Sequence, residues 1–209
     1  MEANYIKFAY FEKGDKFNIA FIPEKRSEIK STTDRNIKST IRKTMNITFH
    51  YTSPLGGITL SSDGESLTGL WFDGQKYYPN KLVEESTESE LPIFAQTCNW
   101  LDIYFSGEEP DFTPSISLQT TTFRKAVYDI LLTIPYGQTM TYGEIANILA
   151  EQQGVERMSA QAVGSAVGHN PISIIIPCHR VVGADGSLTG YAGGLDKKTA
   201  LLKLEKYEI

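Results

Sequence analysis

The sequence predicts a mixed α/β protein in which an antiparallel sheet comes first and a helical region follows. Apolar and polar residues alternate through much of residues 45–75, which is the pattern of half-buried strands. In residues 121–209, apolar residues instead recur every three or four positions, as in amphipathic helices. We therefore divide the chain into domains 45–118 and 119–209, and treat residues 1–44 as an extension of unknown role.

Length and composition limit the class of protein. The chain has 209 residues, 41% of them hydrophobic, which suits one large globular domain or two small ones. No segment approaches the roughly 20 apolar residues of a membrane helix, and the N-terminus does not resemble a secretory signal. The two cysteines, Cys98 and Cys178, cannot form a disulfide framework or a four-ligand zinc site. We therefore expect a cytoplasmic protein without a membrane segment.

The net charge of −5 is unevenly distributed. Residues 1–44 hold 10 Lys/Arg against 6 Asp/Glu, residues 45–120 hold 2 against 11, and residues 121–209 hold 8 against 8. An acidic surface repels a phosphate backbone, so we expect any nucleic-acid contact to lie in the last segment, with few phosphate contacts and a shallow salt dependence.

The strand-rich elements come first in the chain. A hairpin is predicted within the extension, from residues 6–11 and 17–22. Residues 45–75 predict three antiparallel strands, and the polar, acidic residues 79–91 predict a loop. A helix over 91–104 follows from apolar residues at helical spacing, one of which, Cys98, we interpret as a packing cysteine.

Four helices are predicted after residue 120. They cover residues 123–134, 142–152, 159–168 and 196–205. Thr141 and Glu144 form a capping box before the second helix, Gly154 ends it, and Ser159 caps the third. The second and third helices have the order of a helix-turn-helix, although two ordinary packed helices would give the same pattern.

The third of these helices is built almost entirely of small residues. Gln161 is its only long polar side chain. A helix that reads bases from the major groove normally projects several such side chains. Small residues instead let the helix backbone approach a surface or a narrow groove closely.

Pro177-Cys178-His179-Arg180 is the most informative stretch of the chain. It follows an apolar run and precedes Val181, so its polar groups are expected in a packed interior. A cysteine beside a base or a cation is a strong nucleophile, whereas a lone buried cysteine only packs. Adjacent side chains of an extended chain point to opposite faces, so His179 can serve Cys178 only through a turn or a water. Glu205 either orients His179 or is a solvated carboxylate.

A glycine-rich segment, residues 188–194, follows this motif. It lacks the Gly-Lys-Ser/Thr ending of a phosphate-binding loop. Its backbone and Tyr191 are suited to the wall of a pocket for a flat ring, and a plain surface loop is the alternative.

Taken together, these residues resemble the DNA-repair alkyltransferases that act on O6-alkylguanine, the methylated-DNA–protein-cysteine methyltransferases. The matching segments are Pro135-Tyr136-Gly137-Gln138, Thr141-Tyr142-Gly143-Glu144, Gly168-His169-Asn170-Pro171, Pro177-Cys178-His179-Arg180 with its apolar flanks, and Gly190-Tyr191-Ala192-Gly193-Gly194-Leu195. The similarity is dense over 121–206, fainter over 45–110 and absent from 1–44.

The resemblance implies a ribonuclease H-like α/β domain over 45–118 and, over 119–209, a helical DNA-binding and catalytic domain with a winged-helix-like helix-turn-helix. It implies a monomer that binds double-stranded DNA through the minor groove and flips the alkylated base out of the stack. It also implies one alkyl transfer to Cys178 per molecule, because the thioether has no leaving route, and it implies no metal and no cofactor.

The resemblance also implies roles for individual residues. Cys178 is the alkyl acceptor, His179 is its base through a water, Glu205 orients His179, and Tyr142 donates a proton or hydrogen bond to the departing guanine. The substrate-binding residues that it implies are Asn170, which braces the active-site turn, and Val181, Tyr191, Ala192 and Gly193. The DNA-binding residues that it implies are Thr141, Ala160, Gln161, Gly164 and Arg180.

One position departs from the family pattern, and three other functions compete. Gln161 stands where the family usually has an intercalating arginine, and Arg157 lies about one helical turn earlier. The competing functions are a non-enzymatic DNA-damage binder of the same fold, a cysteine hydrolase, and a winged-helix regulator with residues 1–44 as a fused sensor remnant. The presence of Cys178 argues against the first, the lack of a marked oxyanion hole against the second, and the absence of a basic face against the third.

Overall fold

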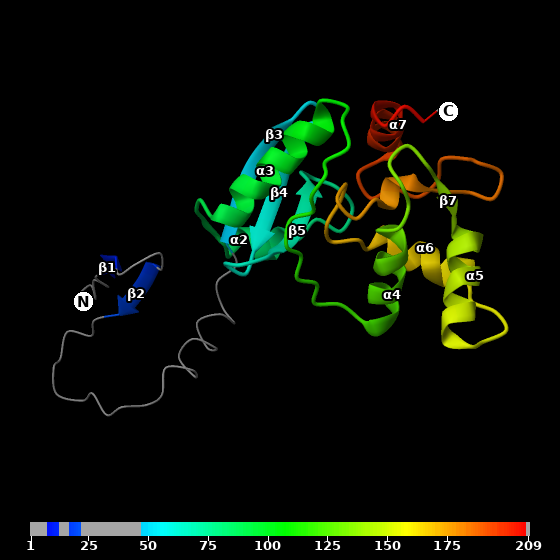
Figure 1. Ribbon diagram of the computed structural model, residues 1–209, viewed down its shortest axis with the longest axis horizontal. Helices are drawn as coiled ribbons and strands as arrows, with labels where there is room; N and C mark the ends of the chain where they lie inside the picture. The colour runs from blue at the N-terminus through cyan, green and yellow to red at the C-terminus, as the bar shows by residue number, and fades with distance from the viewer. Residues whose placement is uncertain (1–7, 13–16, 22–46, 208–209) are drawn as a thin grey trace. The chain divides into compact units, whose positions relative to one another are not determined.

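The computed structural model describes residues 8–12, 17–21 and 47–207 (Figure 1). The chain forms two compact units, Met1–Thr40 and Ile41–Ile209. In the first unit, β1 (Phe8–Glu12) pairs antiparallel with β2 (Phe17–Phe21), which confirms the hairpin for these residues. The ends of the predicted strands and the turn between them lie outside the described residues.

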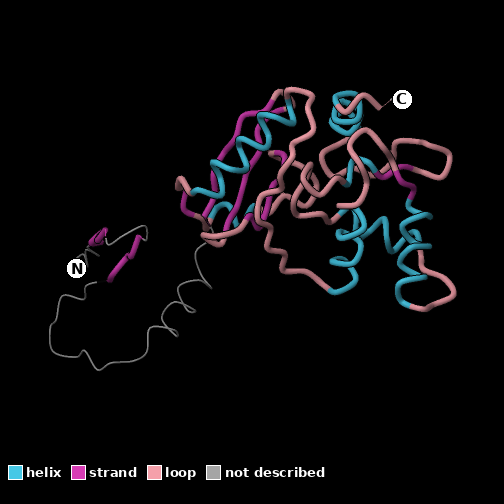
Figure 2. Tube along the Cα trace, viewed as in Figure 1, coloured by secondary structure: helices cyan, strands magenta, loops and turns pink. Residues whose placement is uncertain are grey.

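The second unit begins with the predicted antiparallel meander. Its strands are β3 (Ile47–Ser53), β4 (Gly56–Ser62) and β5 (Leu67–Phe72). A two-residue strand, β6 (Thr87–Glu88), pairs parallel to β3, so that the order across the sheet is β5-β4-β3-β6. Figure 2 shows the long strands of this sheet side by side in magenta. Ile58 and Leu60 of the central strand β4 are fully buried, so the meander forms part of the core.

The loop predicted over residues 79–91 is wrong in part. This segment contains a short helix, α2 (Asn80–Glu84), in addition to β6. No side chain of α2 is buried, and both residues of β6 are exposed. Elements without a buried face have no apolar period, so the sequence carries no signal for them.

The helix expected after this segment is α3 (Pro92–Phe105), which packs against the sheet (Figure 1). The ring of Phe94 stacks on Phe49 of β3 with centroids 5.8 Å apart. Cys98 is partly buried and packs against the same core, which confirms its interpretation as a packing residue. Tyr104, in the last turn of α3, is fully buried.

The helical region contains α4 (Thr122–Leu131), α5 (Tyr142–Gln153), α6 (Ala160–Gly168) and α7 (Leu195–Leu204). The capping box at the start of α5, the left-handed Gly154 at its end and the Ser159 cap of α6 are confirmed. Helix α4 ends earlier than predicted, because Thr133 and Ile134 donate their N–H groups to Ile130 and Leu131 in tighter turns. Helices α5 and α6 pack on each other in the predicted helix-turn-helix order.

The segment between α6 and α7 carries the Pro-Cys-His-Arg motif and is tied to the sheet. Ser173 donates its N–H to the carbonyl of Leu70 in β5 (2.8 Å), and Leu70 donates to the carbonyl of Pro171 (2.9 Å). A 3₁₀ turn, η1 (Cys178–Arg180), follows, and then β8 (Val181–Val182), which pairs parallel with β7 (Met140–Thr141). The motif is thus held between the sheet and the helices. Among the residues described, no helix is both long and apolar enough to cross a membrane.

Candidate active site around Cys178

A short turn places the thiol of Cys178 in the interior. Residues 178–180 form the 3₁₀ turn η1, in which Arg180 donates its N–H to the carbonyl of Pro177 (2.9 Å). Cys178 is only 3% exposed. The turn that the sequence required for His179 to serve Cys178 is therefore present.

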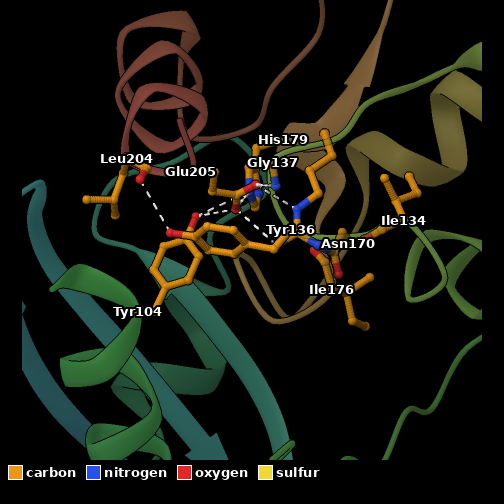
Figure 3. A network of polar contacts seen from close by, with 10 residues as sticks. Tyr104, Ile134, Tyr136, Gly137, Asn170, Ile176, His179, Leu204 and Glu205 are labelled. Atoms are coloured by element: carbon orange, nitrogen blue, oxygen red, sulfur yellow. Dashed lines mark hydrogen bonds and ion pairs between the residues drawn. The ribbon is translucent and has the colours of Figure 1, made fainter. Parts of the chain in front are cut away.

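Asn170 links this turn to the segment before it. Its Nδ2 donates to the carbonyls of Ile176 (2.8 Å) and Ile172 (3.1 Å) and lies 3.1 Å from Sγ of Cys178. Its Oδ1 accepts the N–H of Ile172 (3.0 Å). Figure 3 shows Asn170 next to Ile176. Asn170 is itself buried, so one amide side chain fixes both the loop and the sulfur.

The electrostatic surroundings keep Cys178 protonated at neutral pH. Burial raises the pKa of the thiol to about 11, while the hydrogen bond from Asn170 and the positive charge of Lys198 act in the opposite direction. A thiolate is a far better nucleophile than a thiol. The site therefore needs a base that takes the proton when the sulfur reacts.

His179 has the properties of that base. Its Nε2 lies 2.7 Å from Oε1 of Glu205. Because the carboxylate can only accept, we assign the ring proton to Nε2, which leaves Nδ1 as a proton acceptor. Nδ1 is buried and has no hydrogen-bond partner among the residues described. Burial lowers the pKa of His179, against the opposing effect of Glu205, so the ring is neutral at neutral pH.

Glu205 is the centre of a buried polar network at the end of α7 (Figure 3). Oε1 accepts hydrogen bonds from His179, from the Tyr104 hydroxyl (2.6 Å) and from Nη2 of Arg180 (3.0 Å). Oε2 accepts from Nε of Arg180 (2.8 Å) and from the N–H of Gly137 (3.2 Å). Burial raises the pKa of Glu205, but the hydrogen bonds and charges of His179 and Arg180 outweigh it and hold the pKa at about 2.

Gly137 occupies a position in this network where a side chain would not fit. Its φ is +72°, and a Cβ there would lie 2.7 Å from the carbonyl oxygen of Glu205. Only glycine therefore lets the turn after α4 come close enough to donate to the carboxylate.

Arg180 does not occupy the DNA-binding position that the sequence suggested for it. Its side chain is 11% exposed, and its guanidinium binds both carboxylate oxygens of Glu205 and the carbonyl of Ile134 (2.7 Å). These bonds commit the guanidinium to the interior, where a buried carboxylate needs a partner. We therefore correct the expectation: Arg180 supports Glu205.

Tyr104 was not predicted as a site residue. Its hydroxyl donates to Glu205, and the same oxygen lies 3.3 Å from Nε2 of His179. It belongs to α3, in the first domain, whereas Glu205 follows α7. In the sequence it is one apolar position of an amphipathic stripe, and nothing distinguishes it from its neighbours. Only the fold brings it to the site.

A cavity of about 680 Å³ lies beside this network. Its lining contains six of the predicted residues, Tyr142, Ala160, Gln161, Gly164, Tyr191 and Ala192. Tyr191 also packs edge-on against His179, with ring centroids 6.4 Å apart. One aromatic side chain thus separates the cavity from the base.

Five of the predicted substrate- or DNA-binding residues are not part of the cavity lining: Asn170 and Arg180, described above, and Gly193, Thr141 and Val181. Gly193 lies next to the lining, and a Cβ there would be 2.7 Å from the ring of Tyr191. The Thr141 side chain is used in the capping box of α5. The Val181 side chain is fully buried, and its carbonyl accepts a hydrogen bond from Nζ of Lys198 (2.5 Å). The Val181 side chain is therefore closed off from the cavity, but a carbonyl oxygen has two lone pairs and Lys198 uses one, so a contact of this carbonyl with substrate stays a prediction.

Tyr142 presents a protonated hydroxyl at the cavity. The hydroxyl donates to the carbonyl of Thr189 (3.2 Å), and burial raises the pKa of Tyr142. Gly190 lies directly against it: its φ is +58°, and a Cβ there would be 3.2 Å from the hydroxyl oxygen. The glycine keeps the space around this donor open.

Sequence reasoning also missed Lys76 and Tyr77, which line the cavity from the segment between β5 and α2. It missed Lys198 as well, which is fully buried and binds the carbonyls of Val181 and Thr189. Among the residues described, no group of three or more His, Cys, Asp or Glu side chains is arranged to hold a metal ion.

Comparison with known families accounts for both domains. Residues 48–118 match the family model of the 6-O-methylguanine DNA methyltransferase ribonuclease-like domain. Residues 122–207 match the model of the DNA binding domain of the same enzyme. The predicted fold class, an α/β domain followed by a helical DNA-binding domain, is thereby confirmed.

Individual proteins agree with the family models. A methylated-DNA–protein-cysteine methyltransferase of Mycobacterium bovis is 46% identical over 154 residues, which cover 74% of this chain and 88% of that protein. A Haemophilus influenzae protein of the same name is 42% identical over 158 residues, 75% of this chain and 84% of that protein. The crystal structure of Mycobacterium tuberculosis OGT in complex with DNA has a TM-score of 0.68 and 45% identity, and the match covers 77% of this chain and 93% of that one. The chain therefore belongs to the family of 6-O-methylguanine DNA methyltransferases.

Proposed function

We propose that the protein repairs double-stranded DNA by moving the alkyl group of an O6-alkylguanine onto Sγ of Cys178, once per molecule. The observation that carries this proposal is the buried thiol of Cys178 beside a neutral His179, whose Nε2 is held by Glu205 and whose Nδ1 has no hydrogen-bond partner in the described part of the chain. The cavity next to it, with the Tyr142 hydroxyl on its wall, is suited to a base flipped out of the duplex.

The proposed reaction is one displacement at carbon. A water between Sγ and Nδ1 passes the thiol proton of Cys178 to His179, and the negative charge of Glu205 stabilises the imidazolium that forms. The sulfur attacks the alkyl carbon, the S–C bond forms, and the C–O6 bond breaks with its electron pair leaving on guanine. Tyr142 donates a hydrogen bond or a proton to that departing guanine. No metal or organic cofactor enters the proposed scheme.

The DNA side of the proposal rests on α6. Its face toward the cavity is made of Ala160, Gly164, Ser165 and Gly168, with Gln161 as the long side chain. Small residues let the helix approach the minor groove closely. We propose that O4-alkylthymine is a second substrate, and that the protein acts as a monomer in the cytoplasm, where its two free cysteines stay reduced.

The stoichiometry of the reaction tests this function. Excess duplex carrying a single O6-methylguanine is incubated with the protein, and intact mass and peptide mapping follow the methyl group. We expect one methyl group per molecule, located on Cys178, and no further repair after one equivalent. Repeated repair with Cys178 unmodified contradicts the proposal and favours a hydrolase.

Substitution of Gln161 tests the base-flipping step. Gln161→Ala removes the side chain proposed to fill the gap left by the flipped base. We expect repair of duplex DNA to slow by about tenfold, which corresponds to the loss of one or two hydrogen bonds, while reaction with free O6-benzylguanine keeps its rate. Single-turnover rates with both substrates measure the effect.

Gln152→Ala, at an exposed position near the end of α5, is the matched control and should change neither rate. Equal slowing by Gln161→Ala on the duplex and on the free base removes Gln161 from the flipping step.

Substitution of Tyr104 tests its support of Glu205. Tyr104→Phe removes a donor to a buried carboxylate, so we expect the free energy of unfolding to fall by about 1.5–3 kcal/mol. With one donor fewer, Glu205 favours the protonated form of His179 more strongly. The rate of Cys178 alkylation by O6-benzylguanine should therefore rise with pH through a higher midpoint than in the unaltered protein.

The matched control is Tyr51→Phe, since the Tyr51 hydroxyl donates to Asp102 of α3 at the same distance of 2.6 Å, but in a solvent-exposed hydrogen bond. It should leave the pH profile in place. If Tyr104→Phe lowers stability without moving the profile, Tyr104 supports the fold alone.

A further inference from the structure

Positive charge is scarce at the cavity. Helix α6 contains no Lys or Arg, and Arg180 is committed to Glu205. Arg157 lines a different, smaller cavity at the turn between α5 and α6. Of the described residues that line the main cavity, Lys76 is the only Lys or Arg. It comes from the domain whose net charge is strongly negative, where we expected no contact with nucleic acid.

The segment that carries Lys76 is fixed at its start. Asp73 follows β5, and its carboxylate accepts hydrogen bonds from Thr59 (2.8 Å) and His50 (2.8 Å). Its backbone N–H donates to the carbonyl of Gly57 (2.9 Å). Three contacts with the meander therefore hold the beginning of the segment in place.

The segment is also joined to the catalytic domain. Oε1 of the buried Gln75 accepts hydrogen bonds from the N–H of Phe72 (3.0 Å) and from the hydroxyl of Ser173 (3.3 Å). The backbone N–H of Lys76 donates to the carbonyl of Ala192, in the wall of the cavity (2.9 Å). The backbone position of Lys76 is thus set by contacts with two segments of the catalytic domain, one at Ser173 and one at Ala192.

Tyr77 holds the Lys76 side chain at the cavity. Its φ is +63°, which is uncommon for a residue with a side chain, and this conformation turns the ring onto His169 at the end of α6. The two rings stack with centroids 4.1 Å apart, and Nζ of Lys76 lies 4.8 Å from the Tyr77 ring centroid. Tyr77 is nevertheless 51% exposed. The exposed Tyr77 ring and the Lys76 ammonium group over it together form the edge of the cavity next to the end of α6.

We propose that Lys76 binds a backbone phosphate of the damaged DNA strand next to the nucleotide that enters the cavity. This inference rests on the proposed function. An ammonium group on a fixed segment, continuous with the surface of α6, complements a phosphate that lies beside a flipped base. The ribonuclease-like domain then takes part in DNA binding, through one cation in an otherwise acidic surface.

The salt dependence of repair tests this contact. Rate constants for Cys178 alkylation by a duplex with O6-methylguanine are measured at limiting protein concentration over a series of salt concentrations. Removing one phosphate contact should make the slope of log rate constant against log salt concentration shallower by about 0.9. We therefore expect that change for Lys76→Ala, with several-fold slower repair at low salt, and a slope like that of the unaltered protein for Lys76→Arg.

Lys81→Ala is the matched control. Lys81 lies in the same domain, its side chain is 87% exposed, and it forms an ion pair with Glu85 one helical turn away (3.9 Å). Its substitution changes the net charge by the same amount, but the slope should stay unchanged. Reaction with free O6-benzylguanine, which has no phosphate, should proceed at the same rate in every variant.

Each other outcome is informative. Equal changes of slope in Lys76→Ala and Lys81→Ala overturn the contact, since they show a general effect of net charge. Slower reaction of Lys76→Ala with the free base also overturns it, because Lys76 then acts through the shape of the site. Failure of the unaltered protein to react with either substrate refutes the proposed function itself, which distinguishes that result from the loss of the Lys76 contact alone.

Discussion

Replacing Cys178 by alanine should abolish alkyl transfer completely while the protein still folds. Sγ is the only atom of the site that can form the S–C bond, and no neighbouring side chain can replace it. The sulfur accepts a side-chain hydrogen bond from Asn170, whose Nδ2 keeps its bonds to two carbonyls when the sulfur is removed. Transfer of a labelled methyl group from duplex DNA to the protein should fall to background, while circular dichroism stays that of the unaltered protein.

The other cysteine provides the control for this experiment. Burial raises the pKa of Cys98 to about 11 as well, and Asp102 adds to this effect, but no imidazole contacts its sulfur among the residues described. Cys98→Ala should accept one methyl group per molecule, as the unaltered protein does. Label on Cys98 in the Cys178→Ala variant would contradict the assignment of Cys178 as the acceptor.

Replacing Glu205 by glutamine should destabilise the protein strongly and stop the reaction. The change leaves the buried guanidinium of Arg180 without its counter-charge, and breaking such a pair typically costs about 3–5 kcal/mol. It also removes the charge that stabilises a protonated His179. Denaturant unfolding measures the first effect, and the rate of reaction with O6-benzylguanine measures the second.

Two further variants separate charge pairing from general damage. The double substitution Glu205→Gln with Arg180→Met removes both charges and should recover part of the stability, but none of the activity. Asp129→Asn breaks the exposed pair of Lys125 with Asp129, which has a similar N–O distance of 2.7 Å, and should cost less than about 1 kcal/mol. Equal losses in Glu205→Gln and Asp129→Asn would refute the burial argument.

The same carboxylate predicts how stability depends on pH. The pKa of Glu205 is about 2 in the folded protein, against 4.5 as its ordinary value. A lowered folded-state pKa contributes stability above the unfolded value and loses it as the pH falls from 4.5 towards 2. The unaltered protein should therefore become less stable through this range, whereas Glu205→Gln should lose less stability there.

Much of the fold could be predicted because its signals are local. Each of these signals spans only a few consecutive residues. Examples are the capping box of Thr141 with Glu144, the glycine that ends α5, and the alternation of apolar and polar residues in β3. The site was predictable where it coincided with a dense motif around Cys178. Helix α2 was not predictable, because it buries nothing.

The remaining site residues could not be predicted because their partners are distant in the sequence. Tyr104 and Glu205 are 101 positions apart, and their hydrogen bond exists only when α3 and α7 meet. The prediction for Arg180 was wrong for a related reason. A cation beside a reactive cysteine suggests a DNA contact, and the carboxylate that binds it, Glu205, lies 25 positions further along the chain. Lys76 looked like one solvated lysine in an acidic domain until its segment was seen against Ala192.

The hydroxyl of Tyr104 has a consequence for how this chain can be divided. Family models treat the two domains as separate modules, yet the Glu205 carboxylate of the second domain receives its shortest hydrogen bond from Tyr104 of the first. A protein shortened to its helical half would expose the Glu205 carboxylate to water and would lack the hydrogen bond from Tyr104. If the first domain is exchanged for that of a relative, we expect alkyl transfer to be kept only when the new domain places a tyrosine at the position of Tyr104. The two domains are therefore expected to function as a matched pair.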